Sequence, residues 1–306
     1  MHYRRGIHPV PLSRITAGAA KLTVGLILVW GKPQTALAHG DVHLGIHELT
    51  LQIEKSPGVE LYLKRGDLYR LDANYPAALS DLEQAEELAP GLSAIRLCLG
   101  RTHYEARQYR LALPPLNQLL ARCPDHPDGT LLRARTHAAL GDHASAVRDF
   151  DHLIVIMASP SPDTYLERAG ALVALGRSQE AIRSLDEGIA RAGNLQSLQQ
   201  AALRIELAMS RYDDALSRVG RTLPTLQRKE FWQARQGEIF EAAGRHREAG
   251  IAFTAALASI ESLPAQHRAA KPVADLEAGL RDRTRSLIPE ASKTSQPHTP
   301  KLRPPP

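Results

Sequence analysis

The feature that most restricts the fold of this 306-residue chain is an internal repeat of 34 residues. Six units begin at Val59, Ser93, Pro127, Pro162, Gln196 and Glu230. Successive starts are separated by 34, 34, 35, 34 and 34 residues. A period in this range indicates that one short supersecondary unit is copied along the chain. Because such a unit cannot bury its apolar face alone, the units are expected to stack on one another.

Three positions within the unit keep one size of side chain. Position 8 is small in five units and is Leu203 in the fifth, and position 20 is alanine in all six. Position 24 is always bulky and apolar: Leu82, Leu116, Phe150, Leu185, Val219 and Phe253. This spacing predicts two antiparallel helices per unit, with close backbone approach at the small residues. Glycine in turns such as 140–143 and 175–178 would supply a left-handed helix cap.

With these repeated residues, the chain resembles the tetratricopeptide repeat family over about residues 59–264. The resemblance implies an all-α fold, a right-handed superhelical solenoid of about six helix-turn-helix repeats. It also implies that the first helix of each repeat lines a concave groove, with positions 2, 5, 9, 12 and 13 pointing into it. The resemblance is specific for fold and says little about function.

The sequence outside the repeats completes a prediction of domain organisation. The predicted boundaries are a secretory signal peptide at 1–38, an N-terminal capping helix at 39–58, repeats at 59–92, 93–126, 127–161, 162–195, 196–229 and 230–264, a C-terminal capping helix at 265–288, and a disordered proline-rich tail at 289–306. Capping elements are expected because the two end repeats would otherwise expose an apolar face. Six prolines in the last eighteen residues favour disorder there.

The first 38 residues have the layout of an export signal. Basic residues precede an apolar run at 22–30, which is followed by Ala36-Leu37-Ala38, a typical cleavage sequence. The alternative is an uncleaved membrane anchor, but nine apolar residues span about 14 Å, less than half of a ~30 Å hydrocarbon core. We therefore expect cleavage after Ala38, a periplasmic or secreted mature protein, and no stable membrane insertion.

The net charge of +5 belongs to this same segment. The chain has 38 basic and 33 acidic residues, and residues 1–38 hold five of the basic ones and no acid. The remainder therefore sums to zero. A neutral mature chain argues against nucleic acid as a partner, since such binding depends on neutralising phosphates.

Charged residues at positions 7 and 23 predict a structural pair across the two helices of a repeat. Units one and three carry arginine at position 7 and aspartate at position 23, giving Arg65 with Asp81 and Arg133 with Asp149. Unit two has neither charge. Unit four has Arg168 opposite Ser184, which leaves the partner of Arg168 open.

No motif for catalysis or phosphate binding appears in a suitable context, so we expect no enzymatic activity and no cofactor. The predicted function is that of a scaffold that binds a peptide or protein partner in the groove. The candidate groove residues are Asp67, Arg101, Tyr104, Leu131, Arg135, Arg204 and Glu238. Arg101 and Arg135 would suit a partner with an acidic centre. In the alternative, the groove charges pair among themselves, for example Arg101 with Glu105.

Two further features leave alternatives open. His39, His43 and His47, with Asp41 as an oxygen ligand, could bind Cu(II) or Zn(II), making the chain a metal-binding periplasmic protein. These histidines could equally be solvated. Cys98 and Cys123, the only two cysteines, could form a disulfide in an oxidising compartment or remain free thiols.

Overall fold

The structure is a computed structural model that describes residues 38–287, with side chains described from residue 41 onward. Within this range the chain forms helices, turns and loops and contains no strand. Residues 1–37 of the predicted signal peptide and the predicted tail at 289–306 lie outside the described residues. None of the helices between residues 38 and 287 has the length and apolar character needed to cross a membrane.

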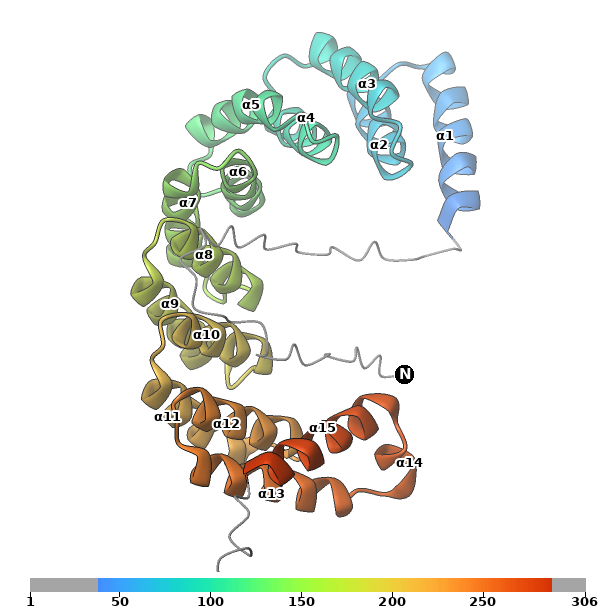
Figure 1. Cartoon of the computed structure of the whole chain (residues 1–306). Coiled ribbons are helices and arrows are strands. Elements are labelled where there is room, and N and C mark those ends of the chain that lie inside the picture. Colours follow the sequence, from blue (N-terminus) through green and yellow to red (C-terminus); the bar gives the residue numbers. More distant parts are fainter. Residues whose placement is uncertain (1–37, 288–306) are drawn as a thin grey trace, which may run out of the picture. The chain divides into compact units, whose positions relative to one another are not determined.

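The helices follow one another along the chain with short connections (Figure 1). They are α1 (Ala38–Lys55), α2 (Val59–Leu71), α3 (Tyr75–Leu88), α4 (Ser93–Glu105), α5 (Tyr109–Arg122), α6 (Pro127–Ala139), α7 (His143–Ile156), α8 (Pro162–Ala174), α9 (Ser178–Ala192), α10 (Gln196–Ala208), α11 (Tyr212–Thr222), α12 (Glu230–Ala242), α13 (His246–Glu261), α14 (Ala265–Arg268) and α15 (Lys271–Leu287). A short 3-10 helix, η1 (Leu223–Thr225), follows α11. The helices α2, α4, α6, α8, α10 and α12 begin at the residues from which the sequence repeats are counted.

The described chain forms two compact units, and the boundary between them in the sequence falls within α10. The N-terminal unit contains residues 38–202 and the C-terminal unit residues 203–287. In the N-terminal unit α2 packs on α3, α4 on α5, α6 on α7 and α8 on α9, so that each repeat is a helical hairpin. In the C-terminal unit α12 packs on α13 in the same way. The all-helical repeat architecture predicted from the 34-residue period is confirmed.

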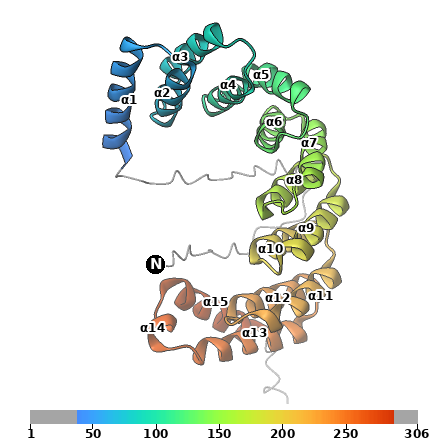
Figure 2. The same ribbon diagram turned by 180° about the vertical axis from the view of Figure 1, so that it is seen from behind.

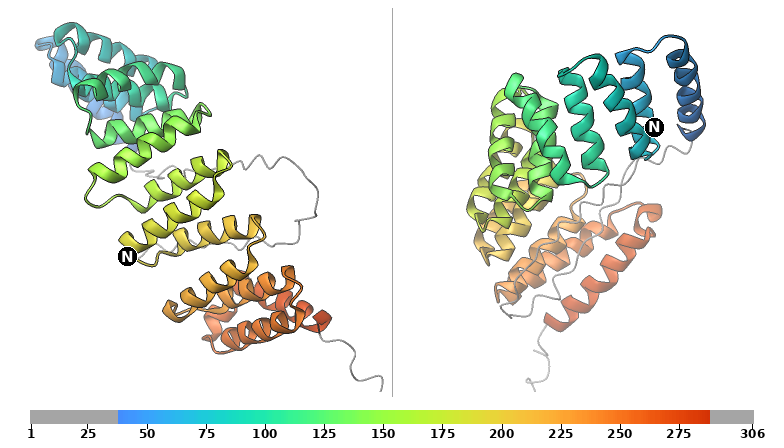
Figure 3. Two further views of the ribbon diagram at one scale, coloured as in Figure 1. Left: turned by 90° about the vertical axis from the view of Figure 1, so that its left-hand side faces the viewer. Right: turned by 90° about the horizontal axis from the view of Figure 1, so that it is seen from above.

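The hairpins of the N-terminal unit stand side by side in sequence order. The first helices α2, α4, α6 and α8 follow one side of the row, and α3, α5, α7 and α9 follow the other (Figures 1 and 2). Consecutive first helices touch, α2 with α4 and α4 with α6. Helix α1 packs on α2 at the end of the row, as the right-hand view of Figure 3 shows. One face of this unit is therefore built from first helices alone.

The positions that keep one size of side chain in every repeat, positions 20 and 24, lie in the buried core. All six position-20 alanines have no exposed surface, and every position-24 side chain is at most 1% exposed. A Cβ atom added to Gly100 would lie 2.6 Å from the side chain of Leu116. The small residue at position 8 thus makes room for the bulky residue at position 24, because protein interiors are close-packed.

The turn within each hairpin uses one backbone conformation. Position 15 has a positive φ in all six repeats, and the residues there are Ala73 (59°), Arg107 (60°), Gly141 (80°), Gly176 (74°), Ser210 (55°) and Gly244 (73°). Only three of the six are glycine, the residue that adopts this conformation without steric cost.

The C-terminal unit is closed by its last helix. Val273 and Leu280 of α15 are 3% exposed and join a cluster with Ala256 and Ile260 of α13. A second cluster joins Leu203 with residues of α11 and α12. Helix α15 therefore covers apolar surface that the sixth repeat would otherwise expose, as expected of a capping helix.

Candidate functional site

The arginines at position 7 of repeats one and three each bind the aspartate at position 23. Arg65 donates to Asp81 from Nε (2.8 Å) and Nη2 (2.6 Å), and Arg133 donates to Asp149 from Nε (2.9 Å) and Nη2 (2.6 Å). Both aspartates are buried. Such bidentate pairs fix geometry as well as charge, so these residues hold the two helices of a hairpin together.

Each of these arginines also reaches the element that precedes its hairpin. Arg65 Nη1 donates to Thr50 Oγ1 of α1 at 3.0 Å, and Arg133 Nη1 donates to Asn117 Oδ1 of α5 at 3.2 Å. These two arginines therefore link their hairpin to the preceding helix as well as joining the helices within one repeat.

Repeats four and five use different partners for the same purpose. Arg168 lies 2.5 Å from Asp151 of the preceding repeat and 3.5 Å from Glu187, and it also donates to Ser184 Oγ at 3.3 Å. In repeat five the charges are exchanged: position 23 is Arg218, which donates to Glu206 of α10 at 2.7 Å. The side chains of Arg218 and Glu206 are each 4% exposed, so this ion pair is buried.

The first helices of the N-terminal unit bring several of the predicted groove residues together. We define the first-helix face by Asp67 and Arg70 of α2, Arg101, Tyr104 and Glu105 of α4, Arg135 of α6 and Glu167 of α8. At one end of this face Arg70 donates to Asp67 Oδ1 at 2.8 Å and to Glu105 Oε2 at 2.7 Å. The predicted groove acid Asp67 is therefore neutralised by a neighbouring turn of its own helix.

Arg135 is paired at the other end of the first-helix face. Its Nε and Nη2 atoms donate to the two carboxylate oxygens of Glu167 at 2.8 and 2.7 Å. Burial lowers the pKa of Arg135, but the hydrogen bonds and charge of Glu167 outweigh this and leave the pKa raised. Arg135 is thus a permanently charged link between α6 and α8.

An aromatic pair lies between these two charge clusters. The rings of Tyr104 and Tyr109 are 5.4 Å apart at an angle of 57°. Burial raises the pKa of Tyr104, and Arg135 and Glu167 lie close enough to act on it electrostatically. Tyr104 therefore presents a neutral phenol and an apolar ring between the charged groups, an arrangement suited to contact with a partner.

Arg101 differs from the other cations of the first-helix face. It is half-buried on α4, and within residues 41–287 it has no hydrogen bond or ion pair to another side chain. The pairing of Arg101 with Glu105 that the sequence allowed does not form, because Glu105 receives Arg70 instead. Among the three arginines of the first-helix face, Arg101 is therefore the one without an acidic partner in the described part of the chain.

The remaining groove residues are placed differently. Leu131 is half-buried on α6 in the N-terminal unit. Arg204 and Glu238 belong to the C-terminal unit, so they are not part of the first-helix face. Burial raises the pKa of Glu238, which lies 2.8 Å from Arg235 and 3.6 Å from Arg283 of α15. Glu238 is therefore engaged by the capping helix.

Both cysteines are free thiols and are partly buried. Cys98 lies on α4, where burial raises the pKa of its thiol, with Asp67, Arg101 and Arg70 nearby. The Sγ of Cys123 lies 3.8 Å from Ser93 Oγ. The structure thus corresponds to the free-thiol alternative.

The histidines proposed as metal ligands lie on α1. His43 and His47 are exposed, and His43 Nε2 is 3.7 Å from Asp72 Oδ1, whereas the side chain of His39 lies outside the described ones. Among side chains from residue 41 to 287, no group of three or more His, Cys, Asp or Glu residues is arranged to hold a metal. Metal binding by His39, His43 and His47 stays a prediction.

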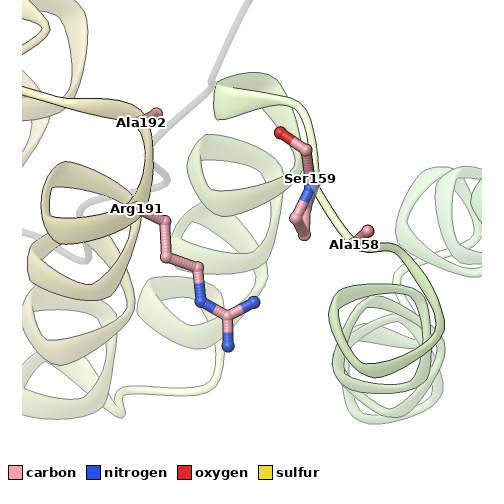
Figure 4. A pocket seen from close by; sticks show the side chains of 5 residues that line it. Ala158, Ser159, Arg191 and Ala192 are labelled. Atoms are coloured by element: carbon pink, nitrogen blue, oxygen red, sulfur yellow. The ribbon is translucent and has the colours of Figure 1, made fainter.

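A surface cavity of about 300 Å³ lies at the longest repeat junction of the N-terminal unit. It is lined by Ala158, Ser159 and Pro160 of the loop before α8 and by Arg191 and Ala192 of α9. In Figure 4 Arg191 extends from α9 toward this loop. Arg191 also lies 3.2 Å from Glu187, which neutralises it. With so few polar groups, the cavity is not a candidate catalytic centre.

The geometry defines an α-helical repeat protein that presents a face of first helices. Residues 98–162 match the family model described as tetratricopeptide repeat. A crystal structure of the C-terminal part of a TPR repeat-containing protein from Cytophaga hutchinsonii is similar, with a TM-score of 0.60 and 16% identity over 77% of this chain and 94% of that one. A tetratricopeptide repeat protein from Parabacteroides merdae ATCC 43184 has a TM-score of 0.50 and 17% identity over 80% of this chain and 94% of that one.

In sequence, a stretch of 103 residues is 33% identical to Bacteriophage adsorption protein A of Escherichia coli (strain K12). The matching stretch is 33% of the present chain and covers only 10% of the length of that relative. Residues 98–162 thus match the tetratricopeptide repeat family, and the solved structures show that the described helices share the fold of such repeat proteins. Proteins of this family are typically non-catalytic scaffolds for protein interaction.

Proposed function

We propose that the chain is an exported scaffold that binds an acidic segment of a protein partner on the first-helix face and performs no catalysis. Three features support this: the scaffold role typical of the family, the aromatic pair of Tyr104 and Tyr109, and the lack of an acidic partner for Arg101 among the described residues. The partner is an extended or helical peptide segment, because a row of parallel first helices offers a long, shallow contact surface rather than an enclosed pocket.

The observation that carries the proposal is the difference between Arg101 and its neighbours. Arg70 forms ion pairs with Asp67 and Glu105, and Arg135 forms one with Glu167. These two arginines therefore hold the helices of the face together. Arg101 has no such partner among the described residues and stands on the same helix as Tyr104. A carboxylate from a partner would complete a bidentate pair with Arg101 at a partly desolvated position, where charged hydrogen bonds are strongest.

Selection from a random peptide display library tests this binding mode. The unmodified protein is expected to enrich peptides that contain at least one Asp or Glu next to an apolar residue. Arg101→Glu should lose this enrichment, since it places like charges together. Arg110→Glu is the matched control, because Arg110 is an exposed arginine of α5 and does not belong to the first-helix face. Equal acidic enrichment by the Arg101→Glu protein would mean that the partner does not use Arg101.

Export is the second part of the proposal and has its own test. When the whole chain is produced in a bacterial host, the protein is expected in the periplasm or medium with His39 as its first residue. N-terminal sequencing of the purified protein measures this directly. Recovery of the chain from the cytoplasm with residues 1–38 still attached would contradict export but would leave the binding proposal intact.

A further inference from the structure

In the N-terminal unit, position 9 of one first helix lies near position 6 of the following first helix. Arg135, at position 9 of α6, donates to Glu167, at position 6 of α8, at 2.8 and 2.7 Å. Between α2 and α4, burial raises the pKa of the Cys98 thiol at position 6, and Asp67 at position 9 raises it further. The same two repeat positions are therefore neighbours at both junctions.

Between α4 and α6 these two positions hold a cation and an apolar side chain. Arg101 stands at position 9 of α4 and Leu132 at position 6 of α6, and both are half-buried. The two helices touch. Arg101 thus occupies the repeat position of Arg135, but Leu132 replaces the acid that Glu167 provides. This replacement explains why Arg101 has no hydrogen bond or ion pair to another side chain within residues 41–287.

The acids around Arg101 restrict the charge of a ligand that binds to it. Besides burial, Asp67 and Arg101 both influence the pKa of the Cys98 thiol, so they lie near one another. Glu105 stands one helical turn after Arg101 on α4, and Arg70 is the shared partner of both acids. A carboxylate carries one negative charge and matches the fork of a guanidinium. A doubly charged phosphate group would be repelled more strongly by the two acids.

We propose that Arg101 and Leu132 form a carboxylate subsite between α4 and α6, in which an Asp or Glu side chain of the partner takes the place that Glu167 holds beside Arg135. This inference rests on the proposed function and locates the acidic contact within the first-helix face. At a half-buried position an ion pair is less weakened by water than on an open surface. Binding therefore depends on the lack of an acid at position 6 of repeat three.

Supplying the missing acid from within the chain tests the position of the subsite. Leu132→Glu should give Arg101 an internal partner and weaken the binding of an acidic peptide, selected by display on the unmodified protein, at least about tenfold. Leu132→Gln has a side chain of the same length as Glu but no charge, so it is the matched control and should change Kd by less than about threefold. Calorimetric titration of the full-length product measures both, and thermal melting checks that the variants fold.

A measurement without any peptide shows whether the introduced carboxylate reaches Arg101. The shift in melting temperature caused by Leu132→Glu should be more favourable when Arg101 is present than in the Arg101→Gln background, because the two charges then pair. Leu132→Gln should cause the same shift in both backgrounds. The same peptide with phosphoserine in place of its acidic residue tests the ligand class, and it should bind at least about threefold more weakly.

The outcomes separate this subsite from the proposed function. The subsite is overturned if Leu132→Glu shows no coupling to Arg101, if Leu132→Glu binds the acidic peptide as well as Leu132→Gln does, or if the phosphopeptide binds more tightly. If the subsite fails in one of these ways but Arg101→Glu still loses the acidic peptide, the proposed function stands. Equal acidic enrichment by the Arg101→Glu protein would overturn both.

Discussion

The turn residue at position 15 shows how a single backbone angle is shared by all six repeats while the residue type varies. Ala73, Arg107 and Ser210 adopt the left-handed conformation that glycine occupies in the other three repeats. For a residue with a Cβ atom this conformation costs about 1 to 2 kcal/mol. The fold tolerates this cost because the turn is fixed by the packing of the two helices on either side.

Ala73 offers a direct test of this cost. Ala73→Gly is expected to raise the free energy of unfolding by about 0.5 to 1 kcal/mol, since Ala73 is exposed and its methyl group contributes no packing. Ala190→Gly, at an exposed position of α9 with helical geometry, should instead lower stability by about 1 kcal/mol. Chemical denaturation of the three proteins measures both shifts, and a loss of stability in the Ala73 variant would contradict the strain.

Glycine at Gly141 and Gly176 made the left-handed turn predictable from sequence in repeats three and four. The residue types of Ala73, Arg107 and Ser210 do not predict a positive φ. A positive φ could be predicted for them only because they occupy the same repeat position as the glycines of the other repeats. The size classes at positions 8, 20 and 24 were more informative, because packing at the helix contact admits few substitutions.

Between helices, the buried ion pair of repeat five is the contact with the largest expected effect. Arg218 and Glu206 are both 4% exposed, and removing one partner of a buried pair typically costs about 3 to 5 kcal/mol because the other charge stays uncompensated. Glu206→Gln should therefore destabilise the protein by about this amount. Arg245→Gln, in an exposed pair with Glu248, should cost about 0 to 1 kcal/mol.

The double variant Glu206→Leu with Arg218→Met separates charge compensation from packing. Replacing a buried ion pair by apolar residues of similar volume is often neutral or stabilising, so the double variant is expected to melt near the unmodified protein. If the double variant is as unstable as Glu206→Gln, the pair contributes through its specific hydrogen bonds rather than through mutual charge compensation.

Ion pairs between helices could be predicted from the sequence only where both charged residues stand at the same two positions of one repeat. Arg65 with Asp81 and Arg133 with Asp149 follow from positions 7 and 23 of one unit. The exchanged pair of Arg218 and Glu206 was not predicted, because its acid stands at position 11. The contacts of Arg65 to Thr50 and of Arg168 to Asp151 reach the preceding element, and they depend on how neighbouring hairpins stack.

For the molecule as a whole, the stacking of neighbouring hairpins determines which predicted groove residues are already paired within the chain and which are left for a partner. In the sequence, Arg101 and Arg135 are equivalent cations at position 9. In the structure they differ, since Glu167 of the next repeat neutralises Arg135 while no acid of the described chain reaches Arg101. The chain after residue 38 carries no net charge, so a local unpaired cation, rather than the overall charge, would select an acidic partner.

The most direct test of this account is a double-mutant cycle across the proposed contact. The peptide that display selects would be titrated calorimetrically, with its acidic residue or the matching amide, against the unmodified protein and Arg101→Gln. We expect each single change to weaken binding and the two losses not to add, with a coupling of at least about tenfold in Kd, or about 1.4 kcal/mol. Independent effects of the two changes, or equal coupling with Arg110→Gln, would contradict the assignment of Arg101 as the partner's anchor.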